Sequence, residues 1–180
     1  MSEASAQPVW TAELGTRDAE ATRALAARIG GVLRPGDLLL LNGELGAGKT
    51  TFTQGLGAGL GVREGIISPT FVLSRIHPSL SGGPALVHVD AYRLADADEL
   101  EDLDLEQDLD ASVTVVEWGR GKAEQLSASR LEITLIRDTG STIAEQGGGP
   151  VLGFSESDDD EPRSIAIAAF GDRWKDQRPF

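Results

Sequence analysis

The sequence predicts an α/β fold of three layers, in which helices flank a largely parallel central sheet. Residues 38–41 are four leucines in a row, a run too short for a helix and typical of a strand buried on both faces of a parallel sheet. Two further β-rich runs, LVHVD at 86–90 and VTVVE at 113–117, each end in a carboxylate. Helical patterns lie before and between these runs, as expected when strands and helices alternate.

The first predicted element is a helix over residues 18–29. Its apolar residues recur four positions apart within an alanine-rich run, and a glycine pair ends it. After the turn RPGD and the strand at 38–41, a glycine loop spans 43–50. Apolar residues then recur at four-residue spacing in segment 52–60, which predicts a second helix. The order is therefore strand, glycine loop, helix.

Three later segments complete the predicted elements. The acidic window 96–110 keeps leucines at helical spacing, which predicts an amphipathic helix whose charges form either a solvated face or a functional acidic patch. Segment 131–136 (LEITLI) alternates, as a strand with one solvated side does. Segment 164–170 (SIAIAAF) predicts a late strand.

The domain organisation follows from length and composition. A chain of 180 residues with 40% apolar residues predicts one globular domain with a real core. We expect residues 1–11 to be a flexible N-terminus, 12–170 to form the domain, and 171–180 to be a C-terminal tail. Within the domain, the composition of 138–163 predicts a mobile acidic insertion.

The net charge of −13 is unevenly placed. Window 96–110 holds 9 acidic residues and window 156–161 holds 5, with no Lys or Arg in either, which leaves 15 acidic residues against 16 basic ones elsewhere. The remaining surface carries no basic run, so we expect no strong independent binding to nucleic acid. The chain also lacks cysteine, a long apolar span and the features of a signal peptide, so we expect a soluble cytoplasmic protein.

The glycine loop matches G-x-x-x-x-G-K-[ST], the phosphate-binding loop (P-loop), through Gly43, Gly48, Lys49 and Thr50. Its glycines permit backbone conformations that turn successive N–H groups toward phosphate oxygens. Lys49 can reach the β- and γ-phosphates, and the Thr50 hydroxyl can bind Mg²⁺. The alternative is an ordinary glycine-rich turn. The residues expected to contact ATP here are Glu44, Leu45, Gly46, Ala47, Gly48, Lys49, Thr50 and Thr51.

Two carboxylates are candidates to complete the site of what is predicted to be a P-loop NTPase-like three-layer fold. Asp90 and Glu117 each follow a strand-like run, and ligands of open α/β sheets collect at the carboxyl ends of the strands. Together with Lys49 they are the predicted catalytic residues, and with Thr50 they are the predicted Mg²⁺ ligands. One carboxylate would hold the Mg²⁺ shell and the other would orient the hydrolytic water; the sequence leaves both assignments open. Otherwise they are strand-end acids that face solvent.

Four further side chains are weaker candidates. His88 lies two residues before Asp90 and either lines the site or is a hydrogen-bonded structural histidine. Thr70, in SPT, is a candidate switch hydroxyl near the γ-phosphate. Trp118 is a candidate to stack on the base or on a partner, or simply packs. Arg93 either touches phosphate or forms a surface ion pair.

The motifs GELGAGKTTF, SPTF, HVDAYRL and VVEWGRG, in this order and spacing, resemble those of the bacterial TsaE (YjeE) family. That family is the ATPase component of the machinery that installs threonylcarbamoyladenosine on tRNA. The resemblance covers about residues 12–137, and SIAIAAFGDRW resembles the closing strand of the family. The acidic insertion departs from the family pattern.

The resemblance implies a compact α/β ATPase that uses ATP and Mg²⁺, with Lys49 and Thr50 at the phosphates and metal. It also implies that Asp90 and Glu117 complete the metal and hydrolytic site, and that Trp118 and Thr70 lie close to the nucleotide. It implies a partner, the TsaB–TsaD heterodimer, which transfers the threonylcarbamoyl group while ATP hydrolysis keeps it turning over. Contact with tRNA would be indirect, through that complex.

Three other functions compete with this interpretation. A small-molecule kinase of the phosphate-loop class usually closes an arginine-bearing lid, whereas Arg63, Arg75 and Arg93 are scattered singly. A GTPase is disfavoured because Asn42 is the only asparagine, so an Asn-Lys-x-Asp motif is absent. The third function is that of a nucleotide-gated binding module whose slow hydrolysis is incidental. We expect low turnover by the isolated chain, because the partner completes part of the catalytic environment.

Overall fold

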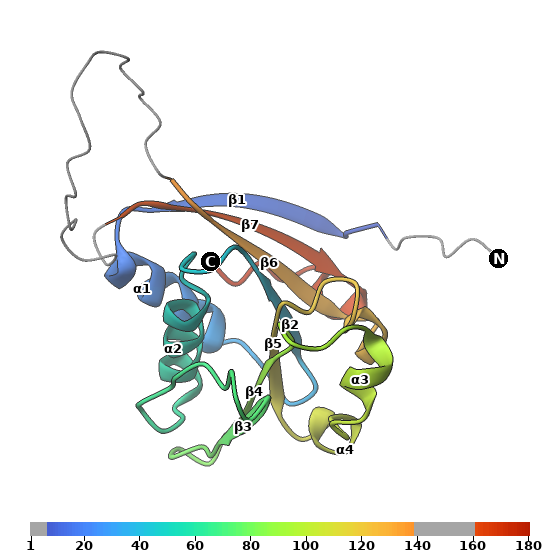
Figure 1. Cartoon of the computed structure of the whole chain (residues 1–180). Coiled ribbons are helices and arrows are strands. Elements are labelled where there is room, and N and C mark those ends of the chain that lie inside the picture. Colours follow the sequence, from blue (N-terminus) through green and yellow to red (C-terminus); the bar gives the residue numbers. More distant parts are fainter. Residues whose placement is uncertain (1–6, 139–160) are drawn as a thin grey trace, which may run out of the picture.

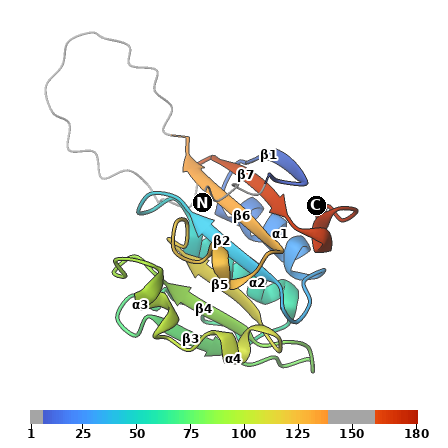
Figure 2. The same ribbon diagram turned by 90° about the vertical axis from the view of Figure 1, so that its right-hand side faces the viewer.

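The computed structural model describes residues 7–138 and 161–180 and shows a mixed α/β fold built on one seven-stranded sheet (Figure 1). The strand order across the sheet is β1-β7-β6-β2-β5-β4-β3, which Figure 2 displays from top to bottom. The strands are β1 (Trp10–Thr16), β2 (Leu38–Asn42), β3 (Ser74–His77), β4 (Leu86–Asp90), β5 (Val113–Glu117), β6 (Arg130–Arg137) and β7 (Arg163–Phe170).

The predicted parallel sheet is confirmed only in its middle. Strands β6, β2, β5 and β4 pair in parallel, whereas β7 pairs antiparallel with both β6 and β1, and β3 pairs antiparallel with β4. Parallel strands need both faces covered, while antiparallel edges tolerate one solvated face. The alternation along β6 matches this difference, because Leu131, Ile133 and Leu135 are buried and Ile136 is exposed.

Helices cover both faces of the sheet and make three layers (Figure 1). On one face lie α1 (Ala19–Gly30) and α2 (Lys49–Leu60), and on the other lie α3 (Ala97–Glu101) and α4 (Glu106–Leu109). Successive leucines of β2 divide between the two cores: Leu39 and Leu41 join the larger core, and Leu38 and Leu40 join the smaller one. The four-leucine run is therefore buried on both faces, as predicted.

The two long helices pack backbone to backbone. Asp18 caps α1 by accepting a hydrogen bond from the Ala21 amide. In α2, Gly55 and Gly59 face α1, and a Cβ on Gly59 would overlap the carbonyl oxygen of Ala27. These glycines let α2 lie close against α1, which places the start of α2 at the end of β2.

The acidic window forms two short helices, so the prediction of a single helix over 96–110 was wrong. A turn with Asp104 at φ 53° separates α3 from α4. Leu100 and Leu105 pack into the smaller core, while the acidic side chains of the window remain exposed. Single buried leucines thus anchor residues 96–110 to the smaller core, and no continuous apolar face of one long helix is needed.

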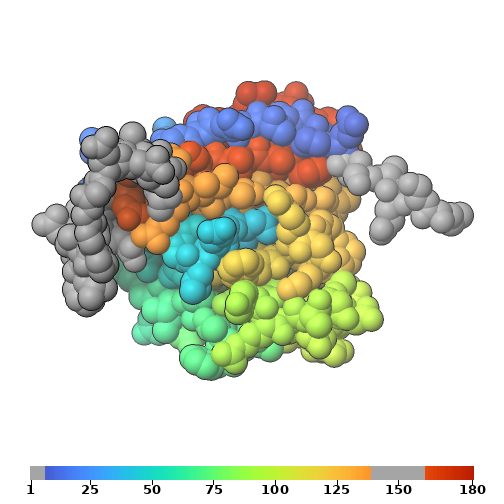
Figure 3. All heavy atoms as spheres, turned by 45° about the horizontal axis from the view of Figure 1, so that its top comes forward, coloured from blue at the N-terminus to red at the C-terminus, as the bar shows by residue number. Residues whose placement is uncertain are grey.

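Both described ends of the domain pack onto the rest of the structure. Strand β1 begins at Trp10, inside the segment 1–11, and lies along β7 (Figure 3). In the tail 171–180, a 3₁₀ turn buries Trp174, and Phe180 packs edge-to-face on Trp10 with ring centroids 5.8 Å apart. Of the predicted insertion 138–163, residues 139–160 lie outside the described residues. Within residues 7–138 and 161–180, no helix is long and apolar enough to cross a membrane.

Candidate functional site

The sheet register brings the predicted motifs to one edge. Strands β2, β4 and β5 are parallel neighbours, so their carboxyl ends meet there. Asp90 pairs with Glu117, Glu117 also pairs with Leu41, and the glycine loop begins two residues after Leu41. A cleft of about 390 Å³ opens at this edge, within the size range of small-molecule sites.

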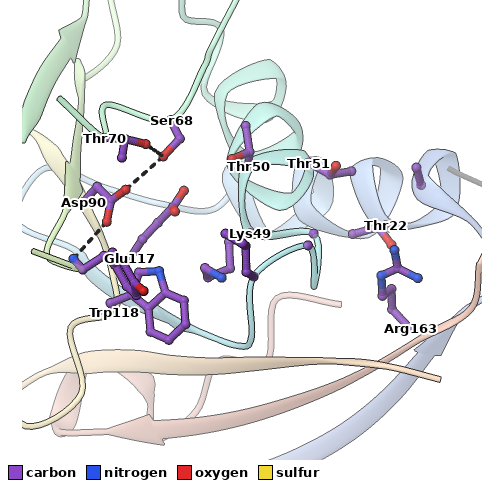
Figure 4. Close-up of a pocket in the computed structure, with 15 residues that line it drawn as sticks. Thr22, Lys49, Thr50, Thr51, Ser68, Thr70, Asp90, Glu117, Trp118 and Arg163 are labelled. Carbon is purple, nitrogen blue, oxygen red and sulfur yellow. Dashed lines mark hydrogen bonds between the residues drawn. The ribbon is translucent and has the colours of Figure 1, made fainter. Parts of the chain in front are cut away.

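The cleft runs between two groups of side chains (Figure 4). Asp90, Glu117 and Trp118 gather at one end, and Thr22 and Arg163 lie at the other. Its lining includes most of the predicted site residues, namely Leu45, Gly46, Gly48, Lys49, Thr50, Thr51, Thr70, Asp90, Glu117 and Trp118.

The glycine loop has the backbone geometry of an anion cradle. Gly43, Gly46 and Gly48 have φ values of 150°, 79° and 102°, a region that favours glycine. A Cβ on Gly43 would lie 2.6 Å from the carbonyl oxygen of Leu135, so the loop curls tightly against β6. Gly48 caps α2 without any side-chain hydrogen bond, which leaves the first amides of the helix available to an anion.

Lys49 bends back over the loop. Its buried ammonium donates to the carbonyl oxygens of Gly43 at 2.8 Å and Glu44 at 2.9 Å, and it lies 4.3 Å from the centre of the Trp118 ring. Burial lowers the pKa of Lys49, while the negative charges of Glu117 and Asp90 oppose that shift. The lysine is thus held at the place where phosphate oxygens would meet the loop.

Two predicted loop residues do not line the cleft. Ala47 points its side chain into the core and is 1% exposed. Glu44 takes part through its carbonyl oxygen, which accepts the Lys49 hydrogen bond. Both residues therefore contribute to the conformation of the loop, and neither side chain lines the cleft.

Asp90 is held by the loop that follows α2. Its Oδ2 accepts a hydrogen bond from Ser68 at 3.1 Å, and its Oδ1 accepts one from the Tyr92 amide at 3.0 Å. Thr70 in turn donates to Ser68 at 3.3 Å (Figure 4). Ser68 was not among the predicted site residues, although its place in the SPT motif beside Thr70 was a usable signal. This chain of hydroxyls joins the SPTF loop to the carboxylate at the end of β4.

Glu117 is held from the other side by His88. His88 Nε2 lies 2.8 Å from Glu117 Oε1, and both side chains are buried. The histidine does not line the cleft, so of its two predicted roles the structure supports the hydrogen-bonded one.

Trp118 closes one side of the cleft with strained backbone. Its φ is 60°, which is uncommon for a bulky residue, and its amide donates to the carbonyl oxygen of Leu41. The ring contacts Tyr92, with centroids 5.0 Å apart, as well as the Lys49 ammonium. Arg93 does not line the cleft; it lies over the ring of Phe71 at 4.9 Å.

Arg163 is a cleft residue that was not predicted from the sequence. It begins β7, far along the chain, and its Nε donates to the carbonyl oxygen of Ala47 at 3.0 Å. No motif contains it, and only the antiparallel pairing of β7 with β6 brings it beside the glycine loop.

The residues present fit a nucleotide with a divalent cation. Within residues 7–138 and 161–180, no group of three His, Cys, Asp or Glu side chains forms a metal site by itself. Mg²⁺ is commonly bound by one or two carboxylates together with substrate phosphates. Thr50, Asp90 and Glu117 line the cleft beside the glycine loop, and their oxygen atoms are of the kind that such a site would use.

Comparison with known proteins decides the family. The model of the family described as threonylcarbamoyl adenosine biosynthesis protein TsaE matches residues 16–144. The chain belongs to the TsaE family. The Streptomyces coelicolor tRNA threonylcarbamoyladenosine biosynthesis protein TsaE is 51% identical over 153 residues, covering 84% of this chain and 93% of that protein. The Bacillus subtilis protein of the same name is 42% identical over 123 residues, covering 68% of this chain and 75% of that protein.

This TsaE-family chain also resembles a solved structure in its fold. The crystal structure of Bacillus subtilis YdiB superposes with a TM-score of 0.64 at 30% identity, covering 92% of this chain and 90% of that chain. The family resemblance read from GELGAGKTTF, SPTF, HVDAYRL and VVEWGRG is therefore confirmed.

Proposed function

We propose that this TsaE-family protein is a P-loop ATPase that uses Mg²⁺ and supports threonylcarbamoyladenosine modification of tRNA through a TsaB–TsaD heterodimer. The observation that carries the proposal is the meeting of Lys49, Asp90 and Glu117 with the glycine loop at one sheet edge. The names of the relatives support the pathway, and the cleft supports the chemistry.

The glycine loop and Lys49 would bind the triphosphate. The loop amides and the N-terminus of α2 attract phosphate oxygens, and the Lys49 ammonium would exchange the carbonyl oxygens of Gly43 and Glu44 for them. That ammonium already lies inside the cleft.

The two carboxylates would have different roles, one in metal binding and the other in orienting water. Thr50 and Asp90 would hold the Mg²⁺, which when bound neutralises charge that develops on the phosphates. Glu117 would orient the hydrolytic water, because His88 holds one of its oxygens and the other is left for the cleft. Asp90 suits the metal role because Ser68 and Tyr92 fix both of its oxygens in place.

The test is ATP hydrolysis by the purified chain, alone and with a cognate TsaB–TsaD complex and tRNA. We expect partner-stimulated phosphate release and sustained tRNA modification, both lost in Lys49→Ala and Glu117→Gln. Glu132→Gln is the matched control, because Glu132 is a strand glutamate that pairs with Arg130 outside the cleft. It should leave hydrolysis unchanged.

Other outcomes would favour the competing functions. If Glu117→Gln abolished hydrolysis but preserved tRNA modification, ATP binding alone would drive the partner, as in a nucleotide-gated binding module. If the partners changed nothing and a metabolite accepted the phosphoryl group, the protein would be a kinase.

A further inference from the structure

The contact between His88 and Glu117 is built into the sheet. His88 pairs with Val115 in the register of β4 and β5, and Glu117 lies two residues further on the same face. The His88 side chain is 0% exposed and that of Glu117 is 4% exposed, with Nε2 and Oε1 2.8 Å apart. A charged group this deeply buried is costly unless it is hydrogen-bonded, so the contact decides how Glu117 is held.

The hydrogen-bond partners of the His88 imidazole indicate which of its two nitrogens carries a proton. A carboxylate accepts hydrogen bonds and does not donate them, so Nε2 is the donor. Among residues 7–138 and 161–180, His88 Nδ1 has no hydrogen-bond partner, and a proton on it would be a buried donor without an acceptor. The arrangement therefore matches the tautomer that carries its proton on Nε2.

We propose that His88 is a positioning residue for Glu117: its Nε2–H binds Oε1 and fixes the carboxylate so that Oε2 serves the cleft. The inference rests on the proposed function, in which Glu117 orients the hydrolytic water. Within the described residues, no other group holds Oε2, and Glu117 lines the cleft. Orientation of a reacting group matters because a misplacement of about 1 Å costs about 100-fold in rate.

Lys49 makes such a restraint necessary. Its ammonium is buried in the same cleft, and the charge of Glu117 acts on it. Without the His88 hydrogen bond, the carboxylate would be free to rotate toward that ammonium. His88 thus keeps Glu117 available for water while Lys49 stays available for phosphate.

A second histidine provides the matched control. His77, on β3, is buried next to His88 with ring centroids 6.3 Å apart, yet it makes no hydrogen bond to Glu117. A leucine at either position removes a buried imidazole from the same region. Only the leucine at position 88 removes the hydrogen bond to the carboxylate.

The kinetic test uses the full chain with its TsaB–TsaD partner. We expect His88→Leu to lower kcat for ATP hydrolysis by about 10- to 100-fold with little change in KM. His88→Gln, whose amide N–H can replace Nε2–H, should recover most of the rate, and His77→Leu should behave as wild type. In His88→Leu/Glu117→Gln, we expect no loss beyond that of Glu117→Gln alone. Equal losses at positions 77 and 88, or additive losses in the double variant, would overturn the proposal.

A second measurement does not depend on ATPase activity. The chain has two histidines, so ¹⁵N-labelled imidazoles give a simple spectrum that His77→Leu assigns. We expect His88 to carry its proton on Nε2 and that N–H signal to shift in Glu117→Gln. A proton on Nδ1, or a signal unaffected by Glu117→Gln, would refute the positioning role even if ATP is hydrolysed. The expected spectrum in a protein without ATPase activity would refute the proposed function and leave the hydrogen bond established.

Discussion

Arg163 links the last strand of the protein to its glycine loop. Its guanidinium is 7% exposed and donates through Nε to the buried carbonyl oxygen of Ala47. A hydrogen bond from a charged donor to a buried acceptor stabilises by about 1.5–3 kcal/mol. Because Ala47 sits between Gly46 and Gly48, this bond braces the part of the loop that would bind phosphate.

We therefore predict that Arg163→Met raises the Kd for ATP by about tenfold, which corresponds to about 1.4 kcal/mol. Titration calorimetry with ATP and Mg²⁺ measures this change. Arg130→Met is the control, because Arg130 is also buried, pairs with Glu132 and lies over the Phe170 ring outside the cleft. The control should lower thermal stability without changing ATP affinity. Equal affinities in the two variants would show that the loop needs no brace from β7.

At the scale of elements, the packing of α1 against α2 controls where the glycine loop ends. Gly59 sits at the helix crossing, where an added Cβ meets the backbone carbonyl of Ala27 rather than a movable side chain. Alanine normally stabilises a helix relative to glycine by about 1 kcal/mol. Here overpacking, which typically costs about 1–3 kcal/mol, opposes that gain.

We predict that Gly59→Ala lowers the free energy of unfolding by about 1–2 kcal/mol, the reverse of its helix propensity. Urea denaturation of the two proteins measures the difference. Gly15→Ala in β1 is the control, since an added Cβ there meets nothing within 4 Å, and it should change stability by less than about 0.5 kcal/mol. A stabilising effect of Gly59→Ala would mean that the helices can separate at no cost.

At the scale of the whole molecule, buried histidine makes folding depend on pH. Burial lowers the pKa of His77 below its ordinary value of 6.5, and repulsion from His88, whenever that imidazole is protonated, and from Arg75 adds to that shift. Between the lowered pKa and 6.5, the unfolded chain binds more protons than the folded protein. The stability that neutral His77 contributes is therefore present above the unfolded pKa and is lost as pH falls.

We predict that the free energy of unfolding falls between about pH 7.5 and about pH 5.5, a range above the ordinary pKa of carboxylates. The fall should be smaller in His77→Leu, which lacks this titrating group. Denaturant titrations of both proteins at the two pH values measure the difference. Equal pH dependence in the two proteins would assign the effect to other groups.

The most local parts of the protein were predictable from sequence. The strand at 38–41, the glycine loop and the start of α2 adjoin one another in the chain, and glycine backbone freedom with a helix N-terminus is a local property. The strand-end positions of Asp90 and Glu117 were equally readable, because each ends an apolar run. Parallel strands then bring such ends to one edge.

The sequence by itself thus determined the family, the glycine loop and the two carboxylates, because residue order within short segments dictates them. Only the tertiary structure decided that β1 lies on β7, that Arg163 reaches Ala47 and that His88 holds Glu117. Those contacts join residues far apart in the chain. They depend on which strands become neighbours, and burial of side chains from the whole sheet selects that arrangement.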